Sequence, residues 1–273
     1  MRVLLTGAGG QLGRDLQRRL NEEEVEAREH SELDITDLSA VLAEVQRVRP
    51  DWIINAAAFN EVDAAESREA EAYAVNADGP ANLAKAAGRW GAAIVHVSTD
   101  YVFDGAKGSA YTEEDQPGPI NAYGRSKLAG EQRVLESRAE ALVVRTAWLY
   151  GRHGKNFVSA IRAAAARGER LRVVADQVGS PTATADLADA VAGLIRSPLR
   201  GMIHAVNAGA CSRYEFARAI VGTRAEVEPI ASADASRPAL RPKNSALRSI
   251  KWSATGLPEM RPWQEALKDF LSS

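Results

Sequence analysis

The chain has 273 residues, of which 45% are hydrophobic, and this suits one large domain or two closely joined ones. Its formal net charge of −2 shows no basic excess, which argues against nucleic acid as a partner. The single cysteine, Cys211, excludes an intrachain disulfide, and no apolar run reaches membrane-spanning length. These features predict a cytoplasmic protein that binds neither nucleic acid nor a membrane.

Short apolar runs alternate with helical patterns along the first 146 residues. The predicted strands lie at 2–6, near 25–30, 52–57, 92–98 and 141–146. The predicted helices lie at 11–22, 37–49, about 64–90 and 122–138. Continuous apolar strands that alternate with helices are typical of a parallel sheet covered on both faces. Right-handed crossovers then make this a doubly wound, Rossmann-type α/β fold.

The second half of the chain has a looser pattern. Further strands are predicted at 171–175 and 202–207, and helices near 156–168, 184–197 and 263–271. We expect residues 1–147, with return segments within about 156–210, to form a dinucleotide-binding domain. Residues 211–273, rich in proline, and the loops near 148–155 and 176–184 would form a smaller substrate-binding lobe. The cleft between the two parts is the expected site.

The segment "LLTGAGGQLGRDL" (4–16) places glycines between a predicted strand and a predicted helix. Glycines allow backbone N–H groups to approach a pyrophosphate closely, and the helix N-terminus adds positive potential. A merely tight turn is the structural alternative. The residues predicted to contact a dinucleotide here are Gly7, Gly10, Gln11, Leu12 and Gly13.

Arg28 lies at the end of the second predicted strand, where NAD-selective enzymes usually place an acid. An arginine can instead pair with a 2′-phosphate, so NADPH is the expected coenzyme, with NADH accepted as well. Asp34 could receive the adenine amino group, with Ile35 beside it. The alternative for Asp34 is a helix N-cap, a role that Asp37 would fill equally well. The small residues that follow the third strand would also line the dinucleotide: Ala58, Phe59 and Asn60.

Tyr123 and Lys127 stand four residues apart in "NAYGRSKLAG" (121–130), so a helix would present both on one face. The structural alternative is an ordinary helix surface. Thr99 follows the strand at 92–98 and adds a hydroxyl at its carboxyl end. A free phenol has a pKa of about 10 and is a sluggish acid at neutral pH. A neighbouring ammonium would lower that pKa, so the pattern predicts a tuned proton donor.

Eight strings between residues 7 and about 247 carry a family resemblance: "GAGGQLG", "LDITD", "NAAA", "VDAAE", "STDYVFDG", "YGRSKLAGE", "VVRTAWLYG" and "RPKNSAL". Together they resemble the dTDP-4-dehydrorhamnose reductase family of the extended short-chain dehydrogenase/reductase superfamily. The resemblance implies reduction of the C4 ketone of dTDP-6-deoxy-L-lyxo-4-hexulose with NAD(P)H, giving dTDP-L-rhamnose for polysaccharides. It also implies that Tyr123 donates the proton, that Lys127 contacts the nicotinamide ribose and that Thr99 holds the carbonyl oxygen.

The resemblance further implies a sugar pocket next to the predicted proton donor. Its expected lining residues are Asp100, Tyr101, Phe103 and Trp148. An indole suits the apolar face of a deoxy sugar, and a core tryptophan is the structural alternative for Trp148. Arg241 could lie near the diphosphate or have a structural role.

Some family members hold Mg²⁺ between subunits through carboxylates. Asp15 stands where glutamate is common, which leaves this interface metal and a homodimer open. The four histidines lack metal-ligand spacing, so no catalytic metal is expected. Two other functions stay as alternatives: a nucleotide-sugar 4-epimerase or dehydratase, and a non-catalytic subunit like the regulatory subunit of methionine adenosyltransferase. Tyr101 stands where dehydratases have a glutamate.

Overall fold

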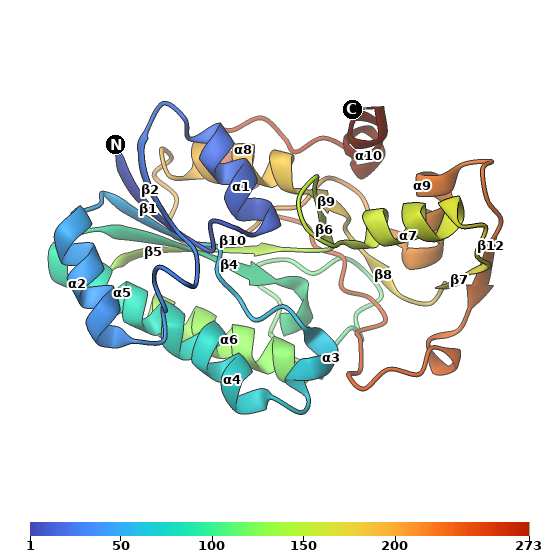
Figure 1. Ribbon diagram of the computed structural model, residues 1–273, viewed down its shortest axis with the longest axis horizontal. Coiled ribbons are helices and arrows are strands. Elements are labelled where there is room, and N and C mark those ends of the chain that lie inside the picture. Colours follow the sequence, from blue (N-terminus) through green and yellow to red (C-terminus); the bar gives the residue numbers. More distant parts are fainter. Residues whose placement is uncertain (273) are drawn as a thin grey trace.

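The computed structural model describes residues 1–272 and has a six-stranded sheet at its centre (Figure 1). Its strands follow the order β10-β5-β4-β3-β1-β2, and every neighbouring pair is parallel. The strands are β1 (Arg2–Thr6), β2 (Glu24–Arg28), β3 (Trp52–Asn55), β4 (Ala93–Thr99), β5 (Glu140–Thr146) and β10 (Gly201–His204). This confirms the predicted doubly wound parallel sheet.

Helices cover both faces of the sheet, as Figure 1 shows. Helices α1 (Gln11–Arg19) and α8 (Thr184–Leu194) pack on one face, and α2 (Leu38–Val48), α5 (Gly79–Trp90) and α6 (Ala122–Leu135) on the other. Successive strand residues point to opposite faces, so Ile53 joins the core under α2 and α5 while Ile54 joins the core under α1 and α8. Because both faces are buried, the inner strands are mostly apolar, whereas the edge strand β2 is charged and partly exposed.

The predicted helix at about 64–90 is broken into several segments. It comprises α3 (Val62–Ala65), α4 (Glu69–Tyr73), the π-helical turn η1 (Ala74–Asp78) and α5. The π-helical turn places the buried Asn76 side chain toward the loop after β3 and toward α6. Its amide accepts a hydrogen bond from the Phe59 backbone N–H at 2.8 Å and donates to the Ser126 hydroxyl at 3.0 Å. The break therefore ties the loop at 56–60 to α6.

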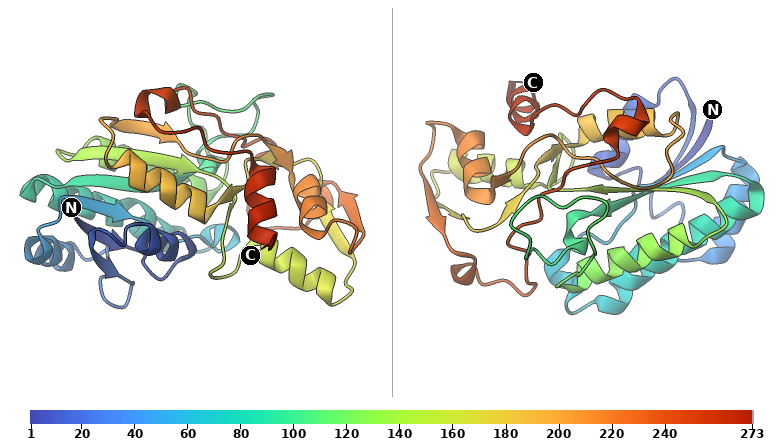
Figure 2. Two further views of the ribbon diagram at one scale, coloured as in Figure 1. Left: turned by 90° about the horizontal axis from the view of Figure 1, so that it is seen from above. Right: turned by 180° about the vertical axis from the view of Figure 1, so that it is seen from behind.

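A smaller lobe stands at one end of the sheet (Figure 2). It has a hydrophobic core of its own, to which Tyr150 and Phe216 contribute. It contains α7 (Phe157–Ala166), β7 (Leu171–Val174), α9 (Arg213–Val221) and β12 (Val227–Ile230), and α10 (Trp263–Ser272) packs on the same core. Neither α9 nor β12 was predicted from the sequence, where this stretch was characterised only by its proline content. The capping box of Ser212 and Glu215 was the available signal for α9.

The remaining elements are short. They are β6 (Leu149–Tyr150), β8 (Val178–Gly179), β9 (Thr182–Ala183), β11 (Cys211–Ser212) and the 3-10 turns η2 (Asp100–Val102), η3 (Ser232–Asp234) and η4 (Trp252–Thr255). Of the return segments expected within about 156–210, α8 and β10 pack on or in the main sheet, whereas α7 and β7 pack in the lobe. Within residues 1–272, no helix combines the length and apolarity needed to cross a bilayer.

Candidate active site

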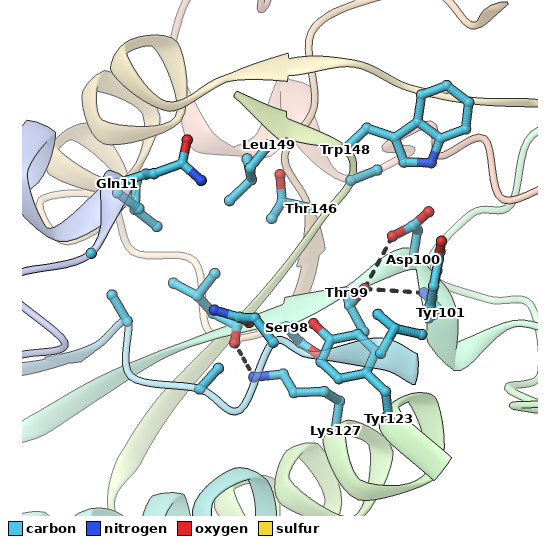
Figure 3. A pocket seen from close by; sticks show the side chains of 18 of the residues that line it. Gln11, Ser98, Thr99, Asp100, Tyr101, Tyr123, Lys127, Thr146, Trp148 and Leu149 are labelled. Carbon is cyan, nitrogen blue, oxygen red and sulfur yellow. Dashed lines mark hydrogen bonds between the residues drawn. The ribbon is translucent and has the colours of Figure 1, made fainter. Parts of the chain in front are cut away.

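A cavity of about 350 Å³ opens at the carboxyl ends of β1, β3, β4 and β5, where the sheet meets the lobe (Figure 3). Its position follows from the fold, because the strand order reverses next to β1 and the loops there diverge. The predicted site residues that line it are Gly10, Gln11, Leu12, Gly13, Ala58, Asn60, Thr99, Asp100, Tyr101, Tyr123, Lys127 and Trp148.

The glycine turn between β1 and α1 forms one end of the cavity. Gly7 has a φ of +73°, and a side chain there would collide with the Ala57 backbone nitrogen at 2.5 Å. A side chain at Gly13 would meet the Gly7 carbonyl oxygen at 2.2 Å. Gly10 is the N-cap of α1 and offers no side chain to its N–H groups. The helix start therefore presents backbone donors and positive potential to an anion, as a pyrophosphate requires.

Two buried hydroxyls in the cavity wall also fit a polar ligand. Ser98 Oγ at the end of β4 and Thr146 Oγ1 at the end of β5 have no hydrogen-bond partner within residues 1–272. A buried hydroxyl without a partner costs about 1–3 kcal/mol, so a ligand that satisfies both is favoured. Together with the glycine turn, these atoms fit a dinucleotide that runs along the cavity.

Tyr123 and Lys127 lie on the face of α6 that looks into the cavity (Figure 3). Asn121 caps this helix by accepting a hydrogen bond from the Gly124 N–H at 2.7 Å. The Lys127 side chain is only 2% exposed, and its Nζ donates to the Val97 carbonyl oxygen at 2.7 Å. Burial lowers the pKa of Lys127 to about 8, and Glu131 counteracts part of this decrease.

The pKa of Tyr123 differs from the sequence-based expectation. Burial raises it above its ordinary value, the Thr99 hydroxyl beside the phenol counteracts part of this increase, and Asp100 and Tyr101 raise the pKa further. The predicted decrease is therefore wrong for this structure, because desolvation has the largest effect on this pKa and the Lys127 ammonium is not among the groups that shift it. The phenol is fully protonated at neutral pH, which is the form that can donate a proton.

Thr99 and Asp100 complete the floor of the cavity beside Tyr123. The Thr99 hydroxyl donates to Asp100 Oδ1 at 3.0 Å and accepts from the Tyr101 N–H at 3.2 Å. Asp100 is 2% exposed, and burial raises its pKa to about 6. The turn η2 after β4 thus fixes the Thr99 hydroxyl next to the phenol.

Trp148 covers the opposite side of the cavity from Tyr123 (Figure 3). Its φ of +46° is left-handed, a conformation that costs roughly 1–2 kcal/mol for a residue with a side chain. A side chain at Gly179 would meet the indole at 2.3 Å, so only glycine fits there. The Arg213 guanidinium carbon lies 3.5 Å from the indole centroid. Gly179 and Arg213 therefore hold the indole in place, and the surrounding structure maintains the strained backbone of Trp148.

The comparisons with known proteins agree with this geometry. The family model described as the RmlD substrate binding domain matches residues 1–273. The chain belongs to this family. A curated dTDP-4-dehydrorhamnose reductase of Mycobacterium tuberculosis (strain ATCC 25618 / H37Rv) is 47% identical over 284 residues, covering 100% of this chain and 93% of the relative.

Solved structures of the same family superpose closely on this chain. A dTDP-4-dehydrorhamnose reductase from Bacillus anthracis str. Ames, in complex with NADP, has a TM-score of 0.96 and 42% identity, covering 99% of this chain and 98% of that one. The protein from Clostridium acetobutylicum has a TM-score of 0.97 and 42% identity, covering 100% and 99%. A Thermus thermophilus UDP-glucose 4-epimerase is 22% identical with a TM-score of 0.87, and shares the fold.

Phe103 does not line the cavity in this member of the family, which corrects the sequence-based expectation. Its side chain is completely buried and stacks on Tyr111, with ring centroids 4.1 Å apart. The Arg145 guanidinium carbon lies 5.1 Å from the centroid of the same ring. Phe103 follows η2, and its backbone turns the side chain into the core beneath the loop. Its role is packing.

Several residues predicted for the dinucleotide lie outside the lining of the cavity. Arg28 donates to Glu44 Oε1 at 2.7 Å and to Glu26 Oε2 at 2.6 Å, so two carboxylates already engage its guanidinium. Asp34 accepts from the Thr36 backbone and hydroxyl, while Asp37 caps α2. The remaining three are also absent from the lining: Gly7 is half-buried in the turn after β1, and Ile35 and Phe59 are buried in hydrophobic clusters.

The sequence analysis missed three polar residues that line the cavity. Ser98 and Thr146 end apolar strands, and polar residues at the carboxyl ends of parallel strands were a usable signal. Arg213 carried no local signal, because only the folding of the lobe brings α9 to the cavity. Arg241 forms a bidentate ion pair with Asp63 at 2.6 and 2.8 Å, which fits the structural alternative.

The interface metal that the resemblance left open has no support in this chain. Within residues 1–272, no group of three or more histidine, cysteine, aspartate or glutamate side chains is placed to hold a metal ion. Asp15 instead accepts a hydrogen bond from the Thr184 hydroxyl at 2.5 Å and pairs with Arg18 at 3.3 Å.

Proposed function

We propose that this chain reduces the C4 ketone of dTDP-6-deoxy-L-lyxo-4-hexulose to dTDP-L-rhamnose, with NADPH as the preferred coenzyme. The chain is an oxidoreductase of its family, and reduction of a keto group on a dTDP-linked sugar is the activity its relatives share by name. The observation that carries the proposal is the placement of Thr99, Tyr123 and Lys127 in one cavity with the glycine turn.

The residues on the floor of the cavity suit ketone reduction. NADPH supplies a hydride when bound. Reduction of the ketone leaves negative charge on its oxygen, and a group that donates a proton there stabilises the transition state. Tyr123 donates that proton, since burial keeps its phenol protonated. The Thr99 hydroxyl beside the phenol orients the carbonyl oxygen, and the Lys127 ammonium adds the positive charge that supports a transient phenolate.

The residues that would hold the coenzyme are those of the glycine turn, the loop after β3 and the free hydroxyls of Ser98 and Thr146. NADPH is proposed because the related Bacillus anthracis structure contains NADP and because Arg28 ends β2. Arg28 uses three of its N–H groups on Glu26, Glu44 and the Ala27 carbonyl, which leaves others for a phosphate.

The test measures NADPH and NADH oxidation by the purified chain with several ketosugars. The panel contains the dTDP-L-lyxo substrate, dTDP-4-keto-6-deoxy-D-glucose, and GDP- and UDP-linked 4-ketosugars. We expect the highest kcat/KM with the dTDP-L-lyxo substrate and NADPH. A higher value with the D-glucose derivative would favour the activity by which a Streptomyces niveus relative, 42% identical, is named. No turnover on any ketosugar would contradict the proposal.

Two further expectations stay predictions. Nucleotide-sugar reduction requires no membrane, which agrees with the expected cytoplasmic location. The homodimer that the resemblance left open is tested by sedimentation of the purified chain with and without EDTA.

A further inference from the structure

Arg213 brings a cation to the cavity wall from the lobe, on the side away from the glycine turn. It is the first residue of α9 and lines the same cavity as Tyr123. Its backbone N–H donates to the Gln177 carbonyl oxygen at 3.1 Å. Its guanidinium carbon lies 3.5 Å from the Trp148 ring centroid and 5.1 Å from that of Phe157. Stacking on two rings holds the planar cation in one orientation.

The charge of Arg213 is not neutralised by an ion pair. Within residues 1–272 no carboxylate lies within 4.0 Å of it, whereas Arg241 on the same side of the cavity pairs with Asp63. Burial lowers the pKa of Arg213, while Tyr101, whose hydroxyl hydrogen-bonds to it, and Asp100 raise it. A partly buried cation without a carboxylate is costly, and an anionic ligand would offset that cost.

The position of Arg213 relative to the floor of the cavity indicates which part of the substrate it would meet. The Tyr101 hydroxyl lies beside the Arg213 and Arg241 guanidinium groups, and the Tyr101 ring centroid is 5.9 Å from that of Tyr123. One aromatic ring therefore separates the proton donor from the cation. In a nucleotide 4-ketosugar, one pyranose ring separates the C4 carbonyl from the phosphate on C1.

We propose that Arg213 binds the diphosphate of the nucleotide sugar and thereby places the C4 carbonyl at Tyr123. This inference rests on the proposed function and adds a specificity-determining residue to it. A planar guanidinium can donate two hydrogen bonds to phosphate oxygens, which a point charge cannot reproduce. Arg213 would thus favour sugars that carry a nucleoside diphosphate over sugars without a phosphate.

The test measures dTDP binding by calorimetry to the NADP⁺-saturated protein and to three variants. Arg213→Met keeps an apolar stem without charge, and Arg213→Lys keeps charge without the planar fork. Arg218→Met is the matched control, because Arg218 lies on the same helix and its guanidinium carbon is 5.8 Å from the Tyr214 ring centroid, outside the cavity. We expect Arg213→Met to weaken dTDP binding about ten- to hundredfold, Arg213→Lys less, and Arg218→Met not at all.

Weaker dTDP binding could come from misfolding, from lost contacts to the phosphates or from lost contacts to the nucleoside. Binding of NADP⁺ and of thymidine distinguishes these three causes. Retained NADP⁺ affinity shows that a variant is folded, and unchanged inhibition by thymidine in Arg213→Met shows that the loss concerns the phosphates. Equal weakening of dTDP and thymidine, or wild-type dTDP affinity in Arg213→Met, would overturn the inference while turnover by the wild type upholds the proposed function. If the wild-type protein neither binds dTDP nor reduces a dTDP-ketosugar, both fail.

Discussion

The floor and the roof of the cavity are built in different ways. The floor comes from β4, η2 and α6, and its groups are held by bonds within this unit, such as Lys127 to the Val97 carbonyl. The roof comes from Trp148, Gly179 and Arg213, which only the lobe brings together. Under the proposed function, the chemistry would depend on one unit of the sheet, whereas substrate selection would depend on how the lobe packs against it. Mutations in the two regions should have separable effects.

The largest effect is expected beneath the floor, at the buried ion pair of Arg145 and Glu131. Both side chains are at most 4% exposed, and they form two hydrogen bonds of 2.6 and 2.9 Å. Arg145→Met leaves Glu131 buried without a partner, so the free energy of unfolding should fall by about 3–5 kcal/mol in urea titrations. The double variant Arg145→Met/Glu131→Leu should recover most of the lost free energy of unfolding, because no charge is then left buried without a partner. A loss under ~1 kcal/mol in the single variant would show that the pair does not support the floor.

Tyr123→Phe tests whether the floor performs the chemistry. Removing the proton donor should lower kcat by at least ~10²-fold, while NADPH affinity, measured by its fluorescence, stays near the wild-type value. Near-normal turnover would remove Tyr123 as the acid. Because the roof is untouched, KM for the ketosugar should change little.

The pH dependence of the rate tests the charge on Lys127. Its ammonium is present below its pKa of about 8 and is lost above it, so kcat/KM should fall about tenfold per pH unit above pH 8. The pKa of Tyr123 is raised, so the phenol does not cause this limb. Lys127→Arg keeps its charge to higher pH and should shift the limb upward. If kcat/KM of Lys127→Arg fell at the same pH as that of the wild type, the titrating group would be a residue other than Lys127.

Gly179→Ala tests the roof alone. The new methyl group would meet the Trp148 indole and displace it, so KM for the ketosugar should rise by roughly tenfold with kcat and NADPH affinity nearly unchanged. Gly108→Ala is the matched control, since nothing lies within 4 Å of the added atom there. A fall in kcat as large as that of Tyr123→Phe would mean that floor and roof are not separable.

The smallest effect on activity is expected at Arg28, near the proposed site of the coenzyme's adenosine, which belongs to neither the floor nor the roof of the cavity. Arg28→Asp should move the ratio of NADPH to NADH kcat/KM several-fold toward NADH, because a carboxylate repels a 2′-phosphate. Glu44→Gln, which frees part of the Arg28 guanidinium, should move it the other way. An unchanged ratio in both variants would show that Arg28 has only a structural role, between Glu26 and Glu44.

Most of the sheet and of the floor could be predicted because their signals are local. An apolar run flanked by a glycine turn, or a Tyr-x-x-x-Lys helix after a strand with a terminal hydroxyl, encodes both the element and its chemistry within a few residues. Strands and helices of the first half accordingly lie where they were expected, apart from the π-helical break at Asn76. That break depends on a partner, Ser126, fifty residues away.

By itself, the sequence determined the fold class through its periodicity, and the family through the resemblance of its strings. It also predicted that Thr99, Tyr123 and Lys127 share one site, and the structure brings them into one cavity. Tertiary structure decided what surrounds those groups. In the folded chain, the Phe103 side chain is buried in the core, and Arg28 pairs with two glutamates. Burial raises the pKa of Tyr123, and packing of the lobe places Arg213 against Trp148. Burial, desolvation and long-range pairing depend on which segments meet, and no single stretch of the chain contains that information.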